Sequence, residues 1–421
     1  MLFGSSGIRR KFDQELLFLS LKTGYAIANP GDRIVAGRDS RSTGPALQDA
    51  FMAGAMFCGA DVYDGGVAPT PTIAHATGKM DAGCCITASH NPESYNGLKL
   101  INPNGSSFTK KQQSETEDKI EKKPKAVFER QGTIKEMDII TPHKEAVLKE
   151  ISIDGKINMV LDCGCGAGCM ITPSLLTTAG VRINCINCNV SGRFPRPSEP
   201  LEKNLSYIHN MIIKSGSDGA LIHDGDADRF MAFDEKGRFI GGDHLLMLFA
   251  LHIGAKKVVT TVDASMAIEE IAEVKRTPVG DSFVSEKLIE WGDFGGEPSG
   301  SWIFPKHTLC PDGIYAAALF CSIASENKIS TLIDEMPDYP ILRSSYMCPD
   351  SVGIMKILGA ENPTDGIRIA DEDGWCLIRA SGTEPKVRIT AEGKTKDLAK
   401  SMRSRGYSLL KSAGKKYKQL N

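Results

Sequence analysis

The sequence predicts an α/β protein made of three similar α/β domains with mixed sheets and a smaller C-terminal α+β domain, around a central cleft. Strand-like and helical runs alternate through the first three quarters of the chain in three sets of similar size, which favours three β-α-β units. From about residue 340 short strands replace this alternation, which indicates a different, smaller domain. The length of 421 residues leaves room for two to four domains, because a domain usually takes about 100 to 200 residues.

The first unit begins with a strand over 33–39, a helix over 46–60 and two further strands over 61–66 and 82–89. The apolar residues of the helical run have the spacing of one helix face, whereas the strand runs are short and bounded by polar or glycine residues. A charged segment over 110–125 then predicts a solvated surface helix leading out of this unit, and its charges need no further role.

The second and third units repeat this plan. In the second unit the expected elements are a strand over 158–164, a helix over 172–180 and strands over 181–187 and 218–226. In the third unit they are a strand over 257–265, a helix over 266–274 and strand and loop segments over 275–281 and 291–300. The expected domains are 1–140, 141–238, 239–338 and 339–421. Each α/β unit would deliver a loop from its strand ends to a shared cleft.

The overall charge excludes some classes of partner. Lys and Arg number 50 against 52 Asp and Glu, so nothing global indicates binding to nucleic acid or to an anionic membrane surface. The apolar run 245–255 is well short of the roughly 20 residues that a membrane span requires, and the N-terminus has no signal-peptide pattern. We therefore expect a cytoplasmic protein, as a monomer or a homodimer.

Twelve cysteines allow two interpretations. The short spacings within 162–169 and 185–188 could hold zinc, since thiolates suit that ion. The spacing is irregular, however, and several cysteines lie in apolar strand contexts, which favours reduced thiols that pack as small buried hydrophobic residues.

The segment CCITASHNPESYNGLKL, residues 84–100, contains a candidate nucleophile. Its apolar start predicts a buried strand. The small hydroxyl, imidazole and amide side chains that follow indicate a loop at the end of that strand. Catalytic groups in α/β proteins usually lie at such ends. Ser89 is therefore a candidate nucleophile, with His90 beside it and Lys99 close by in sequence.

The segment HDGDADRF, residues 223–230, indicates a metal site. Asp224, Asp226 and Asp228 alternate after an apolar strand, and carboxylates this close together repel one another unless a cation lies among them. Hard oxygen ligands favour magnesium, and no glutamate follows at the offset that an EF-hand would need. A solvated acidic turn is the alternative.

Three further loops carry polar side chains that suit a sugar phosphate. The loop 379–389 offers guanidinium, hydroxyl and glycine amide groups to a phosphate through Arg379, Ser381, Thr383 and Arg388, although it could be an ordinary turn. The loop 295–302 contains Glu297 and Ser299, which could bind sugar hydroxyls. The segment 3–10 adds Arg9 and Arg10. The last two are also compatible with ordinary loops.

Taken together, these loops resemble the α-D-phosphohexomutase family over essentially the whole chain. The motifs TASHNP (87–92), DGDADR (224–229), GEPSG (296–300) and SGTEP (381–385) occur in the family's order. The resemblance implies four domains around a deep cleft and transfer of phosphate between O6 and O1 of a hexose, through a phosphoserine and a 1,6-bisphosphate intermediate.

The resemblance also implies roles for individual residues. Ser89 would carry the phosphoryl group, and Asp224, Asp226 and Asp228 would hold Mg²⁺ together with it. Lys99 and Arg9 would assist proton and phosphoryl transfer, Lys99 as a base if the metal and arginines depress its pKa, and Arg229 would lie near the transferring group. His90 could orient the serine or simply pack in the loop. Glu297 and Ser299 would select the sugar, and the residues expected to grip the second phosphate are Arg379, Ser381, Gly382, Thr383 and Arg388.

The identity of the sugar is predicted from one detail of the phosphate loop. The Ser-Gly-Thr of 381–383 is similar to phosphoglucosamine mutases, whereas many phosphomannomutase/phosphoglucomutase enzymes have Ser-Asn-Thr, so we expect a glucosamine phosphate substrate and a hexose 1,6-bisphosphate activator. Ser301 replaces a histidine that many relatives have, so an acid/base role there is lost or moved to another residue, with His307 as a candidate. Arg10 replaces a common glycine and adds charge near the cleft entrance. The alternatives are the phosphomannomutase/phosphoglucomutase activity, a phosphatase, or a non-catalytic sugar-phosphate binder.

Overall fold

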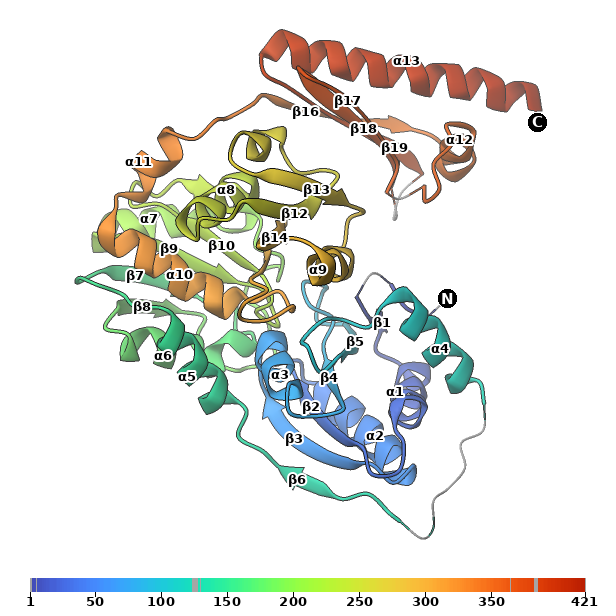
Figure 1. The fold of residues 1–421 in the computed structure, drawn as a ribbon, viewed down its shortest axis with the longest axis vertical. Helices are drawn as coiled ribbons and strands as arrows, with labels where there is room; N and C mark the ends of the chain where they lie inside the picture. The colour runs from blue at the N-terminus through green and yellow to red at the C-terminus, as the bar shows by residue number, and fades with distance from the viewer. Residues whose placement is uncertain are drawn as a thin grey trace.

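The computed structural model describes residues 2–4, 6–122, 128, 130–363, 365–381 and 385–420. Figure 1 shows three units with helices packed on sheets, followed by a C-terminal unit in which a long helix covers an antiparallel sheet. This arrangement confirms the predicted fold class.

The first unit has a mixed sheet in the order β1-β5-β4-β2-β3-β6. β2, β3, β4 and β6 run parallel, and β5 and β1 complete the sheet in antiparallel pairs. The elements are β1 Ile8–Lys11, α1 Gln14–Ile27, β2 Arg33–Arg38, α2 Gly44–Phe57, β3 Asp61–Val67, α3 Thr70–Thr77, β4 Ala82–Ile86, β5 Tyr95–Ile101, α4 Lys110–Ile120 and β6 Ile134–Glu136.

Glycines let α1 and α2 approach closely in this unit. A Cβ on Gly24 would lie 2.1 Å from the carbonyl oxygen of Phe51, and one on Gly54 would lie 2.1 Å from that of Leu21. The charged segment forms a helix only over Lys110–Ile120, which begins with a capping box between Thr109 and Gln112. Residues 123–125 of the predicted surface helix lie outside the described residues.

The second and third units also have mixed sheets, in the orders β11-β10-β9-β7-β8 and β13-β12-β14-β15. The second unit contains α5 Ile140–Glu150, β7 Asn158–Asp162, α6 Thr172–Thr178, β8 Arg182–Ile186, α7 Ser206–Ser215, β9 Gly219–His223, β10 Phe230–Phe233, β11 Phe239–Ile240 and the 3₁₀ helices Ala167–Met170 and Glu202–Asn204. The third contains α8 Gly242–His252, β12 Lys257–Thr261, a 3₁₀ helix Met266–Glu270, β13 Glu273–Thr277, α9 Asp281–Glu290, β14 Phe294–Glu297, β15 Ser301–Ile303, α10 Gly313–Glu326 and α11 Ile329–Asp334.

One predicted helix in the third unit is wrong. The run 266–274 forms only the short 3₁₀ helix, and β13 begins at Glu273. The residues from Glu273 to Thr277 pair in parallel with β12 instead, because this pairing extends the sheet by a strand.

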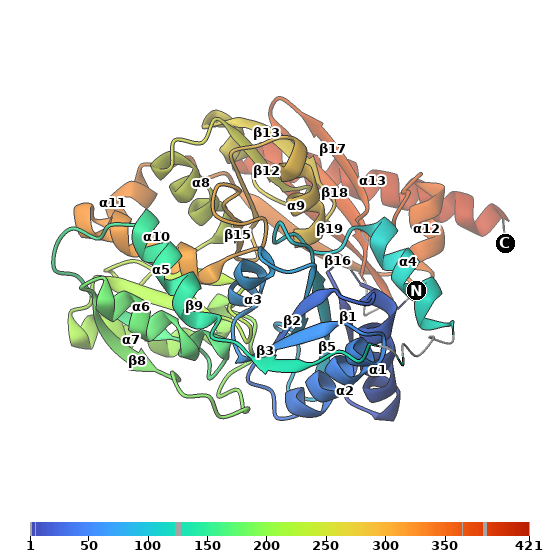
Figure 2. The ribbon, with the colours of Figure 1, turned by 60° about the horizontal axis from the view of Figure 1, so that its bottom comes forward.

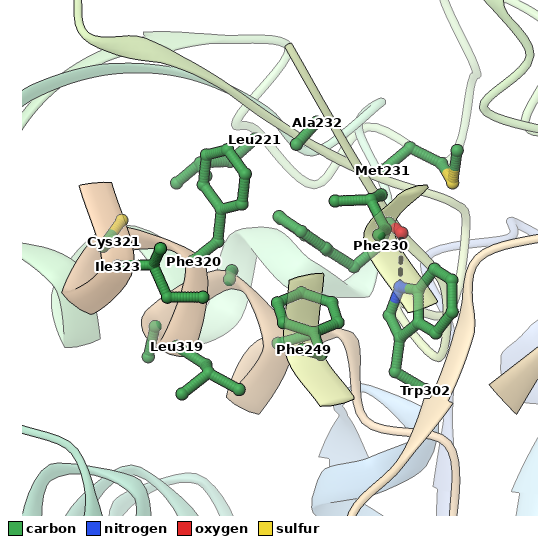
Figure 3. Close-up of a cluster of buried hydrophobic side chains, with 14 of the residues drawn as sticks. Leu221, Phe230, Met231, Ala232, Phe249, Trp302, Leu319, Phe320, Cys321 and Ile323 are labelled. Atoms are coloured by element: carbon green, nitrogen blue, oxygen red, sulfur yellow. Dashed lines mark hydrogen bonds between the residues drawn. The ribbon is translucent and has the colours of Figure 1, made fainter. Parts of the chain in front are cut away.

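The second and third units share one hydrophobic core. Its buried side chains come from both units, with Val147 and Ile329 as its first and last members in the chain, and α10 of the third unit packs on β10 of the second. Figure 3 shows Phe320 of α10 beside Phe230 of β10, with Trp302 donating a hydrogen bond through its indole Nε1 to the Phe230 carbonyl oxygen at 2.8 Å. The two units therefore form one packed body.

The C-terminal unit has an antiparallel sheet in the order β16-β19-β18-β17. Its elements are β16 Ile341–Met347, α12 Ser351–Ile357, β17 Ile367–Asp371, β18 Gly374–Ala380, β19 Lys386–Gly393 and α13 Lys396–Leu420. Figures 1 and 2 show this unit beside β12 and β13 of the third unit. There the buried Glu392 accepts hydrogen bonds from Ser265 and from the backbone N–H of Met266, which fixes the contact.

Candidate active site

All four units contribute side chains to one cavity of about 350 Å³. The first unit provides β1 and the loop after β4, the second the loop after β9, the third the loop between β14 and β15, and the C-terminal unit the end of β18. The predicted residues that line it are Arg9, Ser89, His90, Asp228, Arg229, Glu297, Ser299 and Arg379. The motifs that lie far apart in the sequence thus meet at one place.

Ser89 lies in the tight loop that follows β4. Its φ of 49° is in the left-handed region, and its backbone N–H donates to Thr87 Oγ1 at 2.8 Å. Its Oγ donates to Asp224 Oδ2 at 3.1 Å and lies 3.4 Å from His90 Nδ1. The hydroxyl is therefore directed at the aspartate loop of the second unit. A non-glycine residue in a strained backbone conformation at such a point is typical of a functional loop.

Arg41 holds the serine loop in this shape, and the sequence reasoning missed it. Its guanidinium donates to the carbonyl oxygens of Ser89, Asn91, Pro92 and Tyr95 at 2.7 to 2.9 Å, and its Nε pairs with Asp39 at 2.9 Å. The side chain is buried. The position directly after a buried strand, within GRDSR, was the available signal, but it does not show that the loop carbonyls are the acceptors.

Removing this arginine is expected to destabilise the protein. We expect Arg41→Met to lower the free energy of unfolding by about 3 to 5 kcal/mol, since it leaves the buried Asp39 carboxylate without its partner. Arg33→Met, at an exposed pair with Asp81, should cost under about 1 kcal/mol. Urea denaturation of both variants measures the difference, and equal costs would contradict the bracing role.

The three predicted aspartates lie together. One carboxylate oxygen from each of Asp224, Asp226 and Asp228 is within 4.8 Å of the other two, and all three side chains are buried. Thr70 of α3 donates to Asp226 Oδ2 at 2.6 Å, which ties the loop to the first unit. Gly225 allows the close approach to the serine loop, because a Cβ there would lie 3.1 Å from the Ser89 carbonyl oxygen.

The charge of this cluster fits a divalent cation. Burial, together with the neighbouring carboxylates, raises the pKa of Asp224 well above its ordinary value and that of Asp226 to about 6. Burial also opposes the charged form of Asp228, but Lys99 and Arg229 outweigh it and hold its pKa below the ordinary value. Asp226 Oδ1 and Asp228 Oδ1 are buried and have no hydrogen-bond partner among the described residues. Oxygen ligands with this geometry suit magnesium.

The pKa of Lys99 is raised, whereas a role as a base would need a lowered pKa. Its Nζ lies 2.8 Å from Asp228 Oδ2 and 3.2 Å from Asp281 Oδ2, and the side chain is 2% exposed. Burial disfavours the charge, but these two carboxylates outweigh it and raise the pKa of Lys99 well above its ordinary value. In this structure Lys99 is a cation between Asp228 of the aspartate loop and Asp281 at the start of α9. Asp281, which also lines the cavity, is the second residue that sequence reasoning missed.

His90 is a neutral imidazole beside the serine. Burial first, and then the nearby Arg229 and Arg9, lower its pKa to about 2. Because the Ser89 hydroxyl donates to Asp224, the neutral ring can orient the serine by donating from Nδ1 to its Oγ. The role that the resemblance left open at this position therefore remains a prediction.

Glu297 lies at the end of β14, where its side chain enters the cavity. Its Oε1 accepts from the backbone N–H of Gly280 at 2.8 Å. Burial, reinforced by Asp281, raises the pKa of Glu297 to about 8. Around neutral pH its carboxyl group therefore carries a proton and can both donate to and accept from a sugar hydroxyl. Ser299 is exposed at the rim of the same loop.

The raised pKa of Glu297 predicts a pH dependence of stability. The folded state binds this proton more tightly than the unfolded chain, whose glutamate titrates near 4.5, so the contribution is complete below pH 4.5 and is lost as the pH rises through about 8. The free energy of unfolding should fall by up to about 1.4 kcal/mol per pH unit over this window. Glu297→Gln should remove that part of the slope in urea titrations, whereas identical slopes for both proteins would contradict it.

The predicted phosphate loop is only partly described. Arg379 lines the cavity, and Arg388 lies directly opposite it on the neighbouring strand β19. Like charges on paired positions destabilise a sheet, so this pair is suited to an anion. Ser381 donates through its backbone N–H to the Lys386 carbonyl oxygen at 2.9 Å. Gly382 and Thr383 lie outside the described residues.

Two residues considered for the cavity are not among the residues that line it. His307 is not among its lining residues and instead contacts Glu150 and Asp312, because the chain turns away from the cavity after β15. Arg10 pairs with Glu15 at 2.6 Å and does not line the cavity either, since alternate residues of β1 point to opposite sides. The cysteines are not paired in disulfides, and the metal-ligating groups found among the described residues contain none of them.

Three α/β units, a C-terminal antiparallel unit and a cavity at their junction define a protein of the phosphohexomutase class. Residues 1–127, 141–237 and 241–339 match the alpha/beta/alpha domains I, II and III of phosphoglucomutase/phosphomannomutase, and residues 348–405 match its C-terminal domain. The chain therefore belongs to the phosphoglucomutase/phosphomannomutase family.

Individual relatives agree with this assignment. A "Probable phosphoglucosamine mutase" of Methanosarcina acetivorans is 42% identical, covering 94% of this chain and 96% of the relative. A "Phosphoglucosamine mutase" of Methanococcus maripaludis is 39% identical, covering 97% and 98%. The solved structure of a phosphoglucomutase/phosphomannomutase family protein from Burkholderia thailandensis has a TM-score of 0.88 at 24% identity, covering 98% of this chain and 97% of that one. None of the helices in the described part of the chain is long and apolar enough to cross a membrane.

Proposed function

We propose that this protein is a phosphoglucosamine mutase that interconverts glucosamine 6-phosphate and glucosamine 1-phosphate. The observation that carries the proposal is the Ser89 hydroxyl, which is directed at a buried aspartate cluster in a cavity that also contains the guanidinium groups of Arg9, Arg229 and Arg379. The names of the archaeal relatives and the Ser-Gly-Thr sequence of 381–383 support glucosamine as the sugar.

The reaction consists of two phosphoryl transfers. In the first, a hydroxyl oxygen of the hexose monophosphate attacks the phosphorus of phospho-Ser89 and the bond from phosphorus to Ser89 Oγ breaks. The proton of the attacking hydroxyl passes through a base of the site to Ser89 Oγ, which becomes a hydroxyl again. The product is a hexose 1,6-bisphosphate, which turns end for end in the cavity. In the second, Ser89 Oγ attacks the phosphorus of the other phosphate, the bond from that phosphorus to the sugar oxygen breaks, and the serine proton passes to the sugar oxygen. Added hexose 1,6-bisphosphate would act as an activator by phosphorylating Ser89.

Asp224, Asp226 and Asp228 would hold Mg²⁺ together with the Ser89 phosphate. When bound, the ion would supply positive charge that stabilises the transferring phosphoryl group. The same aspartates fix the direction of the serine, since Asp224 accepts the hydrogen bond from its hydroxyl. The solved structure of Aspergillus fumigatus N-acetylphosphoglucosamine mutase, with a TM-score of 0.61 at 15% identity, is described as a complex with GlcNAc-6P and magnesium, which supports this choice of ion.

The basic residues would stabilise charge and move the proton. Arg9 and Arg229 line the cavity, and their guanidinium groups would contact phosphoryl oxygens. Lys99 would add its charge from between Asp228 and Asp281, and it can exchange a proton with the reacting hydroxyl when those carboxylates are engaged elsewhere. His90 would orient the serine or accept a hydrogen bond from the sugar hydroxyl.

The third and fourth units would bind the part of the substrate that does not react. Glu297 and Ser299 would contact sugar hydroxyls or the amino group, which selects the hexose. Arg379, Arg388 and Ser381, with Gly382 and Thr383, would bind the second phosphate. Because both ends of the bisphosphate carry a phosphate, one such loop can serve both orientations.

Kinetics with several sugars test this proposal. We would compare kcat/KM for glucosamine, glucose and mannose 1-phosphates with magnesium and a trace of the matching bisphosphate, and follow inorganic phosphate release in the same samples. A large preference for the glucosamine substrate is expected. A preference for glucose or mannose would make the protein a phosphoglucomutase or phosphomannomutase, and phosphate release without isomerisation would make it a phosphatase.

A further inference from the structure

A second group of histidine and aspartate side chains, of types that can bind a metal ion, lies outside the cavity where the first three units meet. His143 comes from α5, and His307 and Asp312 come from the segment between β15 and α10. His75 of α3 stacks on the two other imidazoles, with ring centroids 5.2 Å from that of His143 and 6.2 Å from that of His307. None of these residues has a place in the proposed phosphoryl transfer.

The ligand atoms of three of these residues converge. Asp312 Oδ2 lies 3.0 Å from His143 Nε2 and 3.5 Å from His307 Nε2, and the three atoms are all within 4.8 Å of one another. The side chains of His143 and Asp312 are fully buried, and that of His307 is 2% exposed. His143 Nε2 is within hydrogen-bond distance of Asp312 Oδ2, so the two imidazole nitrogens can share either protons or a cation with this buried carboxylate oxygen.

The hydrogen bonds leave one nitrogen without a partner. The second nitrogen of each imidazole has an oxygen neighbour: His143 Nδ1 lies 2.9 Å from Thr72 Oγ1, and His307 Nδ1 lies 3.0 Å from Glu150 Oε1. In a neutral His307 the contact with Glu150 places the proton on Nδ1, so that Nε2 directs a lone pair at the Asp312 carboxylate. His307 Nε2 is indeed buried without a hydrogen-bond partner among the described residues. A cation between these atoms would remove the repulsion.

We propose that His143 Nε2, His307 Nε2 and Asp312 Oδ2 bind one divalent transition-metal ion of the zinc class. Donor atoms around a tetrahedral ion with bonds of about 2.0 to 2.1 Å are about 3.3 Å apart, and the observed 3.0 and 3.5 Å bracket this separation. Two imidazoles and one carboxylate favour zinc over magnesium, which prefers oxygen ligands. Thr72 and Glu150 occupy the positions of outer hydrogen-bond partners, which commonly orient metal-binding histidines.

The position of this site indicates a structural role. Asp312 Oδ1 accepts from the backbone N–H groups of Ile314 and Tyr315 at 2.9 Å, so the ligand also caps α10. Gly313, at the start of α10, lies against the aspartate loop, because a Cβ there would be 2.6 Å from the Arg229 carbonyl oxygen. An ion bound here would join α5 to the start of α10 directly behind the candidate active site.

Metal content measured by mass spectrometry tests the site. The full chain is produced in zinc-supplemented medium and purified in excess Mg²⁺, which keeps the aspartate cluster occupied. We expect about one zinc per wild-type chain, retained in Asp226→Asn and in His252→Asn, a control at an exposed histidine, and lost in His307→Gln and Asp312→Asn. Asparagine still caps a helix, so Asp312→Asn removes the ligand charge and keeps α10 intact. Glu150→Gln should weaken zinc binding by about 10- to 100-fold.

Cobalt gives an independent readout. Co²⁺ in the tetrahedral site of the wild-type protein should absorb visible light strongly, and Asp312→Asn should abolish this absorption. Wild-type protein that contains no zinc overturns the proposal, and so does zinc that remains in both His307→Gln and Asp312→Asn. If His307→Gln does not fold, the wild type and Asp312→Asn decide the question. These readouts do not depend on mutase activity, so failure of the proposed function would leave them unchanged.

Discussion

Ser89→Ala is expected to abolish turnover and to leave the fold intact. Loss of a nucleophilic serine lowers kcat by at least about 10⁴-fold, since the remaining groups cannot carry the phosphoryl group. The substitution removes one hydrogen bond, to Asp224, and keeps the Cβ, so the strain of the left-handed backbone at this position is unchanged. Kinetics with glucosamine 1-phosphate and thermal unfolding of the same preparation measure the two effects.

Ser40→Ala is a matched control for this variant. Ser40 is a buried serine of the same unit whose Oγ has no hydrogen-bond partner among the described residues. The control should keep both activity and stability. Intact-mass measurements after incubation with hexose 1,6-bisphosphate should show a phosphorylated wild type and an unphosphorylated Ser89→Ala. Full activity in Ser89→Ala would refute the assignment of the nucleophile.

Asp226→Asn is expected to lose metal dependence and rate together. Transition-state stabilisation by a bound cation is worth several kcal/mol, so kcat/KM should fall by about 10²- to 10³-fold. Without magnesium the variant should unfold at an equal or higher temperature than the wild type, because it removes a negative charge whose pKa is raised by burial and by Asp228. With magnesium, the thermal stabilisation seen in the wild type should shrink.

Asp49→Asn provides the comparison for a surface carboxylate, since Asp49 is exposed on α2. Its rate, magnesium titration and unfolding temperature should match those of the wild type. An unchanged magnesium titration in Asp226→Asn would count against the aspartate cluster as the cation site, whatever its effect on rate.

The sequence was informative where chemistry follows a strand. The motifs containing Ser89, Asp224 and Glu297 each come directly after or at the end of a short apolar run, and strand ends that face one cavity bring such motifs together. This local signal predicted the α/β class and pointed to the loops of Ser89 and Asp224, whereas Glu297 gained its predicted role from the resemblance to the family.

Long-range contacts could not be predicted in the same way. The raised pKa of Lys99 depends on Asp228 and, second, on Asp281, which begins a helix in another unit and belongs to no motif. Arg41 acts through backbone carbonyl oxygens, which any sequence would provide, so its neighbours carry no sign of its role. His143 and His307 lie far apart in the chain and meet only because α5 contacts the segment between β15 and α10.

The continuous core of the second and third units affects how this protein can be recombined with its relatives. A chimera that exchanges only one of the two units would place foreign side chains against Phe230, Trp302 and Phe320, where packing leaves little freedom for volume changes. The segment to exchange between relatives is therefore both units together, from Ile140 to Asp334, because this exchange keeps their shared core unchanged. In evolutionary terms, these two units are expected to diverge as one inherited block.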